Sequence, residues 1–161
     1  MSSTGSTQNL SQALRQIVSG AYVLTLKDAQ TGPQAILLSF VQQVGFDPPR
    51  IIVSIYKERP IVPALERTRG FVLNVCAEGD QSLLKRFFES PEAVAKALTE
   101  LLASETGPGL ILAPASAYLV CKVVERVDIG DHWLYIADVS EGATITGRTP
   151  LVHVRRSGLR Y

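Results

Sequence analysis

The chain has 161 residues, 46% of them hydrophobic, and a formal net charge of +1 at pH 7. This length suits one compact domain, residues 1–161, with a single sizeable core, and argues against a two-domain protein. Acidic and basic residues are interspersed and nearly balanced, so the charge gives no sign of a nucleic-acid or anionic-membrane partner. No apolar run approaches the roughly 20 residues that a membrane-spanning helix needs.

The first residues, MSSTGSTQNL, are polar and contain neither a basic region nor an apolar block. They do not resemble a secretory signal, and we expect residues 1–9 to be disordered. The two cysteines, Cys76 and Cys121, lie inside apolar runs and lack the spacing of a zinc site. Buried thiols of this kind are typical of a protein in a reducing cytoplasm.

Residues 10–18 place apolar side chains at helical spacing, which predicts a short amphipathic helix that Gly20 ends. Strands follow. The run 21–28 is rich in β-branched and aromatic residues, and 34–44 is a second apolar run after a turn cluster. This pair predicts a hairpin.

The prolines of FDPPR, residues 46–50, interrupt the next part of the chain because proline cannot donate to a strand ladder. A strand is expected at 51–56. Proline at a first helical turn and a glycine stop then predict a helix over 60–68 that ends at Gly70. The run 70–77 reads as the next strand.

The middle of the chain is helical in character. Apolar residues between 83 and 88 are spaced for one helical face, and Ser90-Pro91-Glu92 combines a cap, a first-turn proline and an acid. These signals predict a helix over 91–104.

Two long strands are expected at 117–127 and 132–142, with a short one at 150–154. Six or seven strands with a few helical inserts, and no regular alternation of strand and helix, predict a mainly β, antiparallel barrel rather than a doubly wound sheet.

Groups for catalysis are scarce. The only histidines are His132 and His153, and no nucleophile elbow, phosphate loop or Gly-x-Gly-x-x-Gly motif is present. If the protein is an enzyme, a bound cofactor is expected to supply the reactive chemistry.

Lys57 and Arg59 come directly before the helix expected at residue 60. Two cationic side chains beside the unpaired N–H groups of a helix start could hold a phosphate. A solvated corner between strand and helix explains the spacing equally well.

Several polar residues can be read in two ways. Asn74, within an apolar strand, either satisfies a nearby loop or reaches a ligand, and the structural role is favoured. Ser39, Gln42 and Gln43 either contact a ligand or face water. His132 is either a turn histidine or a ring beside a cofactor. Trp133 should point to the other side of its strand, either to pack there or to make a dimer contact.

Five segments in order resemble the flavin reductase-like family of FMN-binding split barrels: ALRQIVSGAYVLT, AILLSFVQQVGFDPPRIIVSI, GFVLNVCAEG, GDHWLYIADV and VRRSGLRY. The likeness covers most of residues 13–88 and 115–161. The stretches YKERPIV, GDHWL and RRSGLRY are most similar to the flavin reductase domain at the C-terminus of cyanobacterial flavodiiron proteins.

The resemblance implies an antiparallel Greek-key split barrel and a homodimer that binds FMN at its interface. It implies hydride transfer from NADH or NADPH to the flavin, with a redox partner protein as a possible acceptor. By position, the flavin contacts would be Leu38, Ser39, Phe40, Val41, Gln42, Asn74, Phe87, Arg160 and Tyr161, the phosphate contacts Lys57 and Arg59, and the catalytic residue His132.

The chain also departs from the family pattern. Many relatives have Asn-Ser where this chain has Leu38-Ser39, and hydroxyl residues where it has Pro60 and Val62. Phosphate binding would then depend on Lys57, Arg59 and backbone N–H groups. The segment 89–109 also replaces a loop by a helix, which bears on the nicotinamide pocket. We expect an NAD(P)H-dependent flavin reductase, with a non-catalytic FMN-binding electron carrier or flavin store as the alternative.

Overall fold

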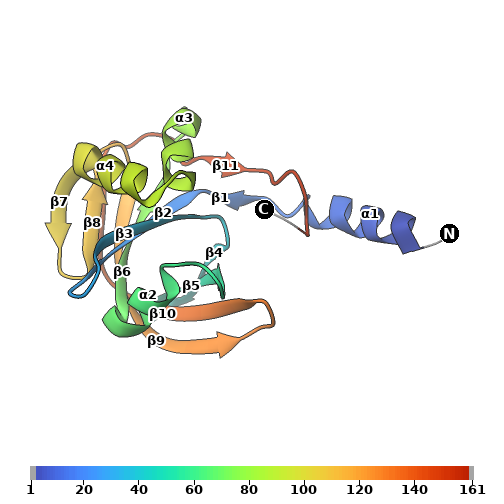
Figure 1. The fold of residues 1–161 in the computed structure, drawn as a ribbon, viewed down its shortest axis with the longest axis horizontal. Helices are drawn as coiled ribbons and strands as arrows, with labels where there is room; N and C mark the ends of the chain where they lie inside the picture. Colours follow the sequence, from blue (N-terminus) through green and yellow to red (C-terminus); the bar gives the residue numbers. More distant parts are fainter. Residues whose placement is uncertain (1–2, 160–161) are drawn as a thin grey trace.

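The computed structural model describes residues 3–159. A seven-stranded antiparallel sheet, in the order β3-β2-β6-β9-β10-β5-β4, curves into a barrel (Figure 1). Its strands are β2 (Tyr22–Asp28), β3 (Gly32–Leu38), β4 (Val41–Phe46), β5 (Pro49–Tyr56), β6 (Gly70–Val75), β9 (Ala117–Asp128) and β10 (His132–Thr144). The predicted mainly β, antiparallel split-barrel fold is confirmed.

Two small sheets and several helices surround this barrel. Strand β1 (Ser19–Gly20) pairs with β11 (Val152–His153), and β7 (Leu102–Thr106) pairs with β8 (Gly109–Leu112). The helices are α1 (Ser3–Leu14), α2 (Val62–Thr68), α3 (Gln81–Leu84), α4 (Pro91–Leu101) and the 3-10 helix η1 (Lys85–Phe88). As predicted, Ser90 caps α4: its Oγ accepts a hydrogen bond from the N–H of Ala93 at 3.3 Å.

Two apolar clusters make most of the core. Alternate residues of the strands fill the barrel, where Tyr135 on β10 lies opposite Val53 on β5 and both are fully buried. The hydroxyl of Tyr135 leaves this apolar interior and donates to Glu66 Oε1 of α2 at 2.7 Å. Outside the barrel, Phe87 and Leu98 pack with the outward face of β2 in a second cluster beneath η1 and α4.

The apolar run 34–44, predicted as one strand, forms two. β3 pairs with β2, whereas β4 pairs with β5 at the opposite edge of the sheet. Between them, the carbonyl of Phe40 accepts a hydrogen bond from the N–H of Ser54 at 2.9 Å. This junction therefore carries the chain from one edge of the barrel to the other.

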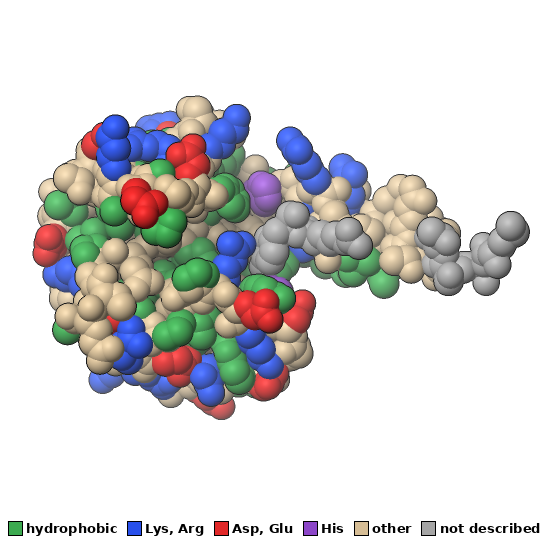
Figure 2. All heavy atoms as spheres, in the orientation of Figure 1, with side chains coloured by type: hydrophobic (Ala, Val, Ile, Leu, Met, Phe, Trp, Pro, Cys, Tyr) green, Lys and Arg blue, Asp and Glu red, His purple; other side chains and the backbone are tan. Residues whose placement is uncertain are grey.

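The helix predicted over 10–18 begins earlier and ends earlier, since α1 spans Ser3–Leu14. Residues 3–9, expected to be disordered, are thus helical, and residues 1–2 lie outside the described part of the chain. α1 projects from the barrel as an arm (Figures 1 and 2), and the chain after β11 returns to it, with the N–H of Gly158 donating to the carbonyl of Ser11 at 3.2 Å.

Three further boundaries differ from prediction. α2 begins at Val62 rather than residue 60, and its end is formed by Arg69, which adopts φ 52°. Gly70 is the first residue of β6, where a Cβ would lie 2.9 Å from the Cβ of Pro108. α4 ends at Leu101, because the following residues form the β7–β8 hairpin.

No helix among the described residues is long and apolar enough to cross a membrane.

Candidate functional site

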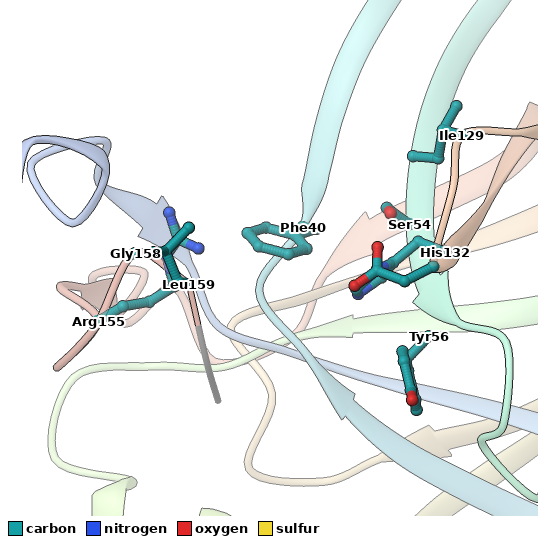
Figure 3. A pocket seen from close by; sticks show the side chains of 9 residues that line it. Phe40, Ser54, Tyr56, Ile129, His132, Arg155, Gly158 and Leu159 are labelled. Atoms are coloured by element: carbon teal, nitrogen blue, oxygen red, sulfur yellow. The ribbon is translucent and has the colours of Figure 1, made fainter. Parts of the chain in front are cut away.

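The first candidate site is a hollow of about 440 Å³ at the start of β10, which we call the His132 hollow. Figure 3 shows Phe40 facing Ser54, Tyr56 and His132 across it, with the C-terminal segment on the other side. It is lined by Phe40, Ser54, Tyr56, Ile129, Asp131, His132, Arg155, Gly158 and Leu159. The structure thus brings two predicted site residues, Phe40 and His132, into one hollow.

A tight turn positions His132. Gly130 adopts φ 106°, a conformation that favours glycine, and its N–H donates to Asp128 Oδ1 at 3.0 Å. The strand that follows places His132 opposite Tyr56 of β5. The polar residues before the apolar strand therefore form the turn that orients the histidine.

The His132 ring is held on several sides. Its Nδ1 lies 2.8 Å from Asp131 Oδ1, and its ring makes edge contacts with Phe40 at 5.9 Å and Tyr56 at 5.6 Å between centroids. Only 12% of the side chain is exposed. The hydrogen bond with His132 also lowers the pKa of Asp131, so that this carboxylate stays charged beside the imidazole.

The C-terminal segment closes one side of the hollow. The Arg155 guanidinium lies 4.7 Å from the Phe40 ring centroid, and its Nη2 donates to the carbonyl of Leu14 at 3.2 Å. Ser157 Oγ lies 3.0 Å from Ser11 Oγ. The segment is therefore fastened to both α1 and Phe40. Arg160 and Tyr161, predicted to lie near the site, are outside the described residues.

The other residues of the predicted segment 38–42 lie in two different places. Ser39, Val41 and Gln42 line a second hollow of about 500 Å³ on the far side of Phe40, beside β1 and β11. Leu38 is buried in the barrel core and, with Tyr56 and Arg59, lines a narrow cleft of only about 10 Å³. Phe40 and Ser54 line both the His132 hollow and this second hollow, so they form the wall that the two share.

A third hollow, which we call the Arg59 groove, has a volume of about 560 Å³. It lies between β3, the residues before α2, and the η1–α4 segment. Its described lining is Thr31, Pro33, Gln34, Ala35, Ile36, Arg59, Pro60, Ile61, Phe87, Phe88, Glu89, Pro91, Val94 and Ala95. Two predicted site residues, Arg59 and Phe87, thus line the same groove. Arg59 also lines the narrow cleft beside Tyr56.

Lys57 has different surroundings from Arg59. Its Nζ is 2.6 Å from Asp128 Oδ1 and 4.3 Å from the Trp133 ring centroid. Arg126 also stacks on Trp133, at 3.8 Å. Lys57 is not among the described residues that line the His132 hollow or the Arg59 groove. Trp133 packs against the barrel core, which confirms its predicted packing role.

Asn74 is engaged with the backbone. Its Nδ2 donates to the carbonyls of Val23 and Leu110 at 3.3 and 3.1 Å, and its Oδ1 accepts from the N–H of Leu112 at 2.9 Å. The residue is 1% exposed. These bonds attach β8 to β2 and β6, which is the structural role favoured for a buried amide in a strand.

Sequence reasoning did not name Ser54, Tyr56 or Arg155 as candidate site residues. The alternation of β5 contained a usable signal, because Ser54 and Tyr56 are two residues apart and so share a face. The position of Arg155 depends on the return of the chain to α1, for which no local pattern exists.

The residue types fit a flat, partly apolar ligand with an anionic end. Phe40, Tyr56 and Ile129 provide apolar walls, His132 and Ser54 provide polar groups, and Arg59 provides a cation beyond the narrow cleft. Within residues 3–159, no group of three or more His, Cys, Asp or Glu side chains could hold a metal ion. A flavin mononucleotide is such a ligand, because it has a flat, partly apolar ring system and a phosphate at its other end.

The chain is also similar to known proteins that are named for flavins. The profile of the family described as "Flavin reductase like domain" matches residues 14–159. The diflavin flavoprotein A 1 of Synechocystis sp. is 34% identical over 160 residues, which cover 95% of this chain and 27% of that protein. Another diflavin flavoprotein A from the same organism is 36% identical over 152 residues, covering 93% of this chain and 25% of its own length. The chain thus spans about a quarter of these relatives.

Solved structures share the fold. The NADH:FAD oxidoreductase of Streptomyces globisporus has a TM-score of 0.78 at 19% identity, over 92% of this chain and 87% of that one. The styrene monooxygenase flavin reductase of Pseudomonas putida has a TM-score of 0.73 at 22% identity, over 89% of this chain and 90% of that one. With the match over residues 14–159, the chain belongs to the flavin reductase-like domain family.

Proposed function

We propose that this domain is an NAD(P)H-dependent flavin reductase that holds FMN between the His132 hollow and Arg59. The observation that carries the proposal is the convergence of Phe40, Tyr56 and His132 around one hollow, beside a narrow cleft that ends at Arg59. A bound flavin would supply the hydride acceptor, and its reduced form would pass electrons to a further acceptor.

The size and chemistry of the site support this proposal. A volume of about 440 Å³ falls within the roughly 300–1,000 Å³ of ligand pockets. Phe40 and Tyr56 offer ring faces, Ser54 offers a hydroxyl, and Arg59 can pair with the phosphate. Of the two cations assigned to the phosphate by resemblance, Arg59 is the better placed, because it lines the cleft and the Arg59 groove, whereas Lys57 is not among the described residues that line either of them.

The protein's own contribution is position and shielding. Asp131 fixes the His132 ring, which borders the space where flavin and nicotinamide would meet. The segment 155–159 covers one side and limits the entry of water. Hydride transfer needs two rings at near-attack distance rather than an acid triad, so proximity can provide most of the acceleration.

A homodimer in the cytoplasm, with its buried thiols reduced, is part of the proposal. Three apolar side chains that are more than half exposed, Ile17, Val18 and Val152, line one hollow beside β1 and β11, where the arm meets the barrel. A monomer rarely leaves this much apolar surface uncovered, and a second copy would cover it. The longer diflavin relatives suggest that the electron acceptor is another redox centre of the same or a partner protein.

Anaerobic reduction tests the activity. Purified protein with FMN should bleach in its oxidised flavin absorbance band after addition of NADH or NADPH, and the better nucleotide should bleach it faster. A His132→Asn variant should retain FMN fluorescence quenching but bleach more slowly. Bound FMN that neither nucleotide bleaches would instead identify an electron carrier or flavin store. A preparation that does not quench FMN fluorescence would contradict flavin binding itself.

A further inference from the structure

The C-terminal end of α1 is completed by residues from the opposite end of the chain. The last carbonyls of a helix lack partners in the next turn and need them from elsewhere. In α1, the carbonyl of Ser11 accepts a hydrogen bond from the N–H of Gly158 at 3.2 Å. The carbonyl of Leu14 accepts one from Arg155 Nη2, also at 3.2 Å. Segment 155–159 therefore caps the helix.

The backbone of this segment lies directly on the helix. A Cβ at Gly158 would contact the Cβ of Leu14 and lie 2.6 Å from the carbonyl oxygen of Ser11. Only glycine lets the two backbones approach this closely. The side chains of Ser11 and Ser157 add a contact between their Oγ atoms at 3.0 Å, although these serines are 146 residues apart in the chain.

The sequence of α1 makes the helix dependent on this cap. It has 12 residues, contains no charged side chain, and is rich in serine, threonine, glycine and asparagine, which are weaker helix formers than alanine. Isolated helices shorter than about 12–15 residues are marginal in water. Residues 5–10 are exposed, and the helix projects from the barrel as an arm (Figures 1 and 2). Arg155 supplies the positive charge that a helix C-terminus favours and that α1 lacks.

The same segment forms one side of the His132 hollow. Arg155, Gly158 and Leu159 line the hollow, and Arg155 also lies over Phe40. Residues 154–159 form neither helix nor strand, so the hydrogen bonds to α1 are a main support of the segment. Unfolding of α1 would remove this support, and departure of the segment would remove the cap of α1. We expect the two to form and to be lost as one cooperative unit.

We infer that α1 controls access to the His132 hollow, because the folding of α1 and the closing of the hollow by segment 155–159 are one equilibrium. The inference rests on the proposed function only for the ligand that the closed hollow holds. No residue of α1 is among the described residues that line the hollow. Because coupling between two sites is reciprocal, a ligand beneath the segment stabilises α1, and a change in α1 alters how tightly the ligand is held.

Amide hydrogen exchange, followed by NMR, tests the coupling in the protein without ligand. Two N–H groups report on it: that of Gly158 in the segment, and that of Arg15, which donates to Ser11 in the last turn of the helix at 3.2 Å. Gln8→Pro should disrupt α1, because proline breaks a helix interior. Gln8 is exposed and is not among the described residues that line the hollow. Gln8→Ala favours the helix and is the matched control.

In Gln8→Pro we expect the N–H of Gly158 to exchange roughly tenfold faster than in Gln8→Ala, the scale of one lost hydrogen bond. Conversely, Gly158→Ala should speed exchange at Arg15. Its control is Gly107→Ala, where a Cβ would meet no atom within 4 Å. Fast exchange at Arg15 in Gln8→Pro, together with unchanged exchange at Gly158, would overturn the inference.

Fluorescence titration with FMN then relates the coupling to the site. Gln8→Pro should bind FMN roughly two- to tenfold more weakly than Gln8→Ala, and FMN should slow exchange at Arg15 in the wild type. Equal FMN affinities of the two Gln8 variants would show that α1 does not control the hollow. Coupled exchange at Gly158 and Arg15, in a protein that binds no FMN, would support the link between α1 and the segment and reject the proposed function.

Discussion

The Arg155 guanidinium lies over the Phe40 ring, 4.7 Å from its centroid, and so joins the C-terminal segment to the junction between β3 and β4. With Ser54, Phe40 also forms the wall that the His132 hollow shares with the second hollow, beside β1. The same contact therefore covers the site and fixes one of its walls.

Removing this contact should loosen the cover. In Arg155→Ala we expect FMN to dissociate roughly two- to tenfold faster, because a cation–π contact contributes about 0.5–1 kcal/mol or more and the hydrogen bond to Leu14 is lost as well. Stopped-flow fluorescence of FMN release measures this rate. The exposed neighbour Arg156 provides the control, and equal rates for Arg155→Ala and Arg156→Ala would show that Arg155 does not hold the cover.

The two cations before α2 should behave differently. Arg59→Ala is expected to weaken FMN binding by about 1.5–3 kcal/mol, the range for a hydrogen bond to a charged group, and riboflavin binding much less. Lys57→Ala should change both affinities little, because Lys57 is paired with Asp128 and stacked on Trp133. Fluorescence titrations with FMN and with riboflavin measure both affinities for each variant. A selective loss of FMN affinity in Lys57→Ala would mean that Lys57 reaches the phosphate.

Asn74 should matter for stability more than for flavin binding. Asn74→Ala leaves the buried N–H of Leu112 without its side-chain partner, and the carbonyl of Leu110 keeps only its hydrogen bond from Thr25 Oγ1 at 2.6 Å. A buried polar group that is left unsatisfied costs about 1–3 kcal/mol. We expect the free energy of unfolding in urea to fall by about 2–4 kcal/mol. FMN affinity, measured at a temperature where the variant is folded, should stay within about twofold. A large affinity loss in a stable variant would assign Asn74 to the flavin.

The ion pair between Asp28 and Arg67 should make stability depend on pH. Asp28 is buried and accepts hydrogen bonds from Arg67 Nη2 at 2.5 Å and Thr31 Oγ1 at 2.6 Å, and these bonds lower its pKa. A carboxylate with a lowered pKa stabilises the fold above its ordinary pKa, here 3.8, and loses this effect as the pH falls further. Asp28→Asn should thus melt at a lower temperature than wild type at pH 7.

That difference in melting temperature should stay constant down to about pH 5 and narrow below about pH 4. Thermal unfolding followed by circular dichroism from neutral to acid pH measures it. A difference that widens on acidification would contradict the assignment of the shift to the pair with Arg67.

The cysteines should be unreactive in the folded protein. Burial raises the pKa of the Cys76 and Cys121 thiols to about 12, so little thiolate exists at neutral pH. Ellman's reagent at pH 8 should release almost no colour from native protein and two equivalents after unfolding in urea. Rapid reaction of one thiol in the native state would show that its segment opens.

The strands with clear patterns were predictable. β5, β6, β9 and β10 each combine β-branched or aromatic residues with breaks at proline, glycine or a turn, and their predicted ranges lie within a few residues of the observed ones. The break between β3 and β4 at Ser39-Phe40 was not predictable, because the apolar pattern continues through it. Only pairing with β2 on one side and β5 on the other separates the two strands.

The site was less predictable than the fold. His132 and Phe40 followed from resemblance, and the structure places them together. The position of Lys57 depends on the register that sets Tyr56 opposite His132 and brings the N–H of Lys57 to the carbonyl of Asp131 at 3.0 Å. From this position the Lys57 side chain reaches Asp128. The spacing of residues along the sequence does not show which distant strands pair, so this contact could not be predicted.

The junction at Ser39-Phe40 also limits how the barrel can open. β3 and β4 end the sheet on opposite sides, yet three peptide links join Leu38 to Val41 and hold their Cα atoms within about 11 Å of each other. The two edge strands, β3 and β4, are therefore held together at this end, whereas no short link joins the Gly32 end of β3 to β4. The spacing of the two edge strands beside Phe40 is therefore fixed by the covalent chain itself.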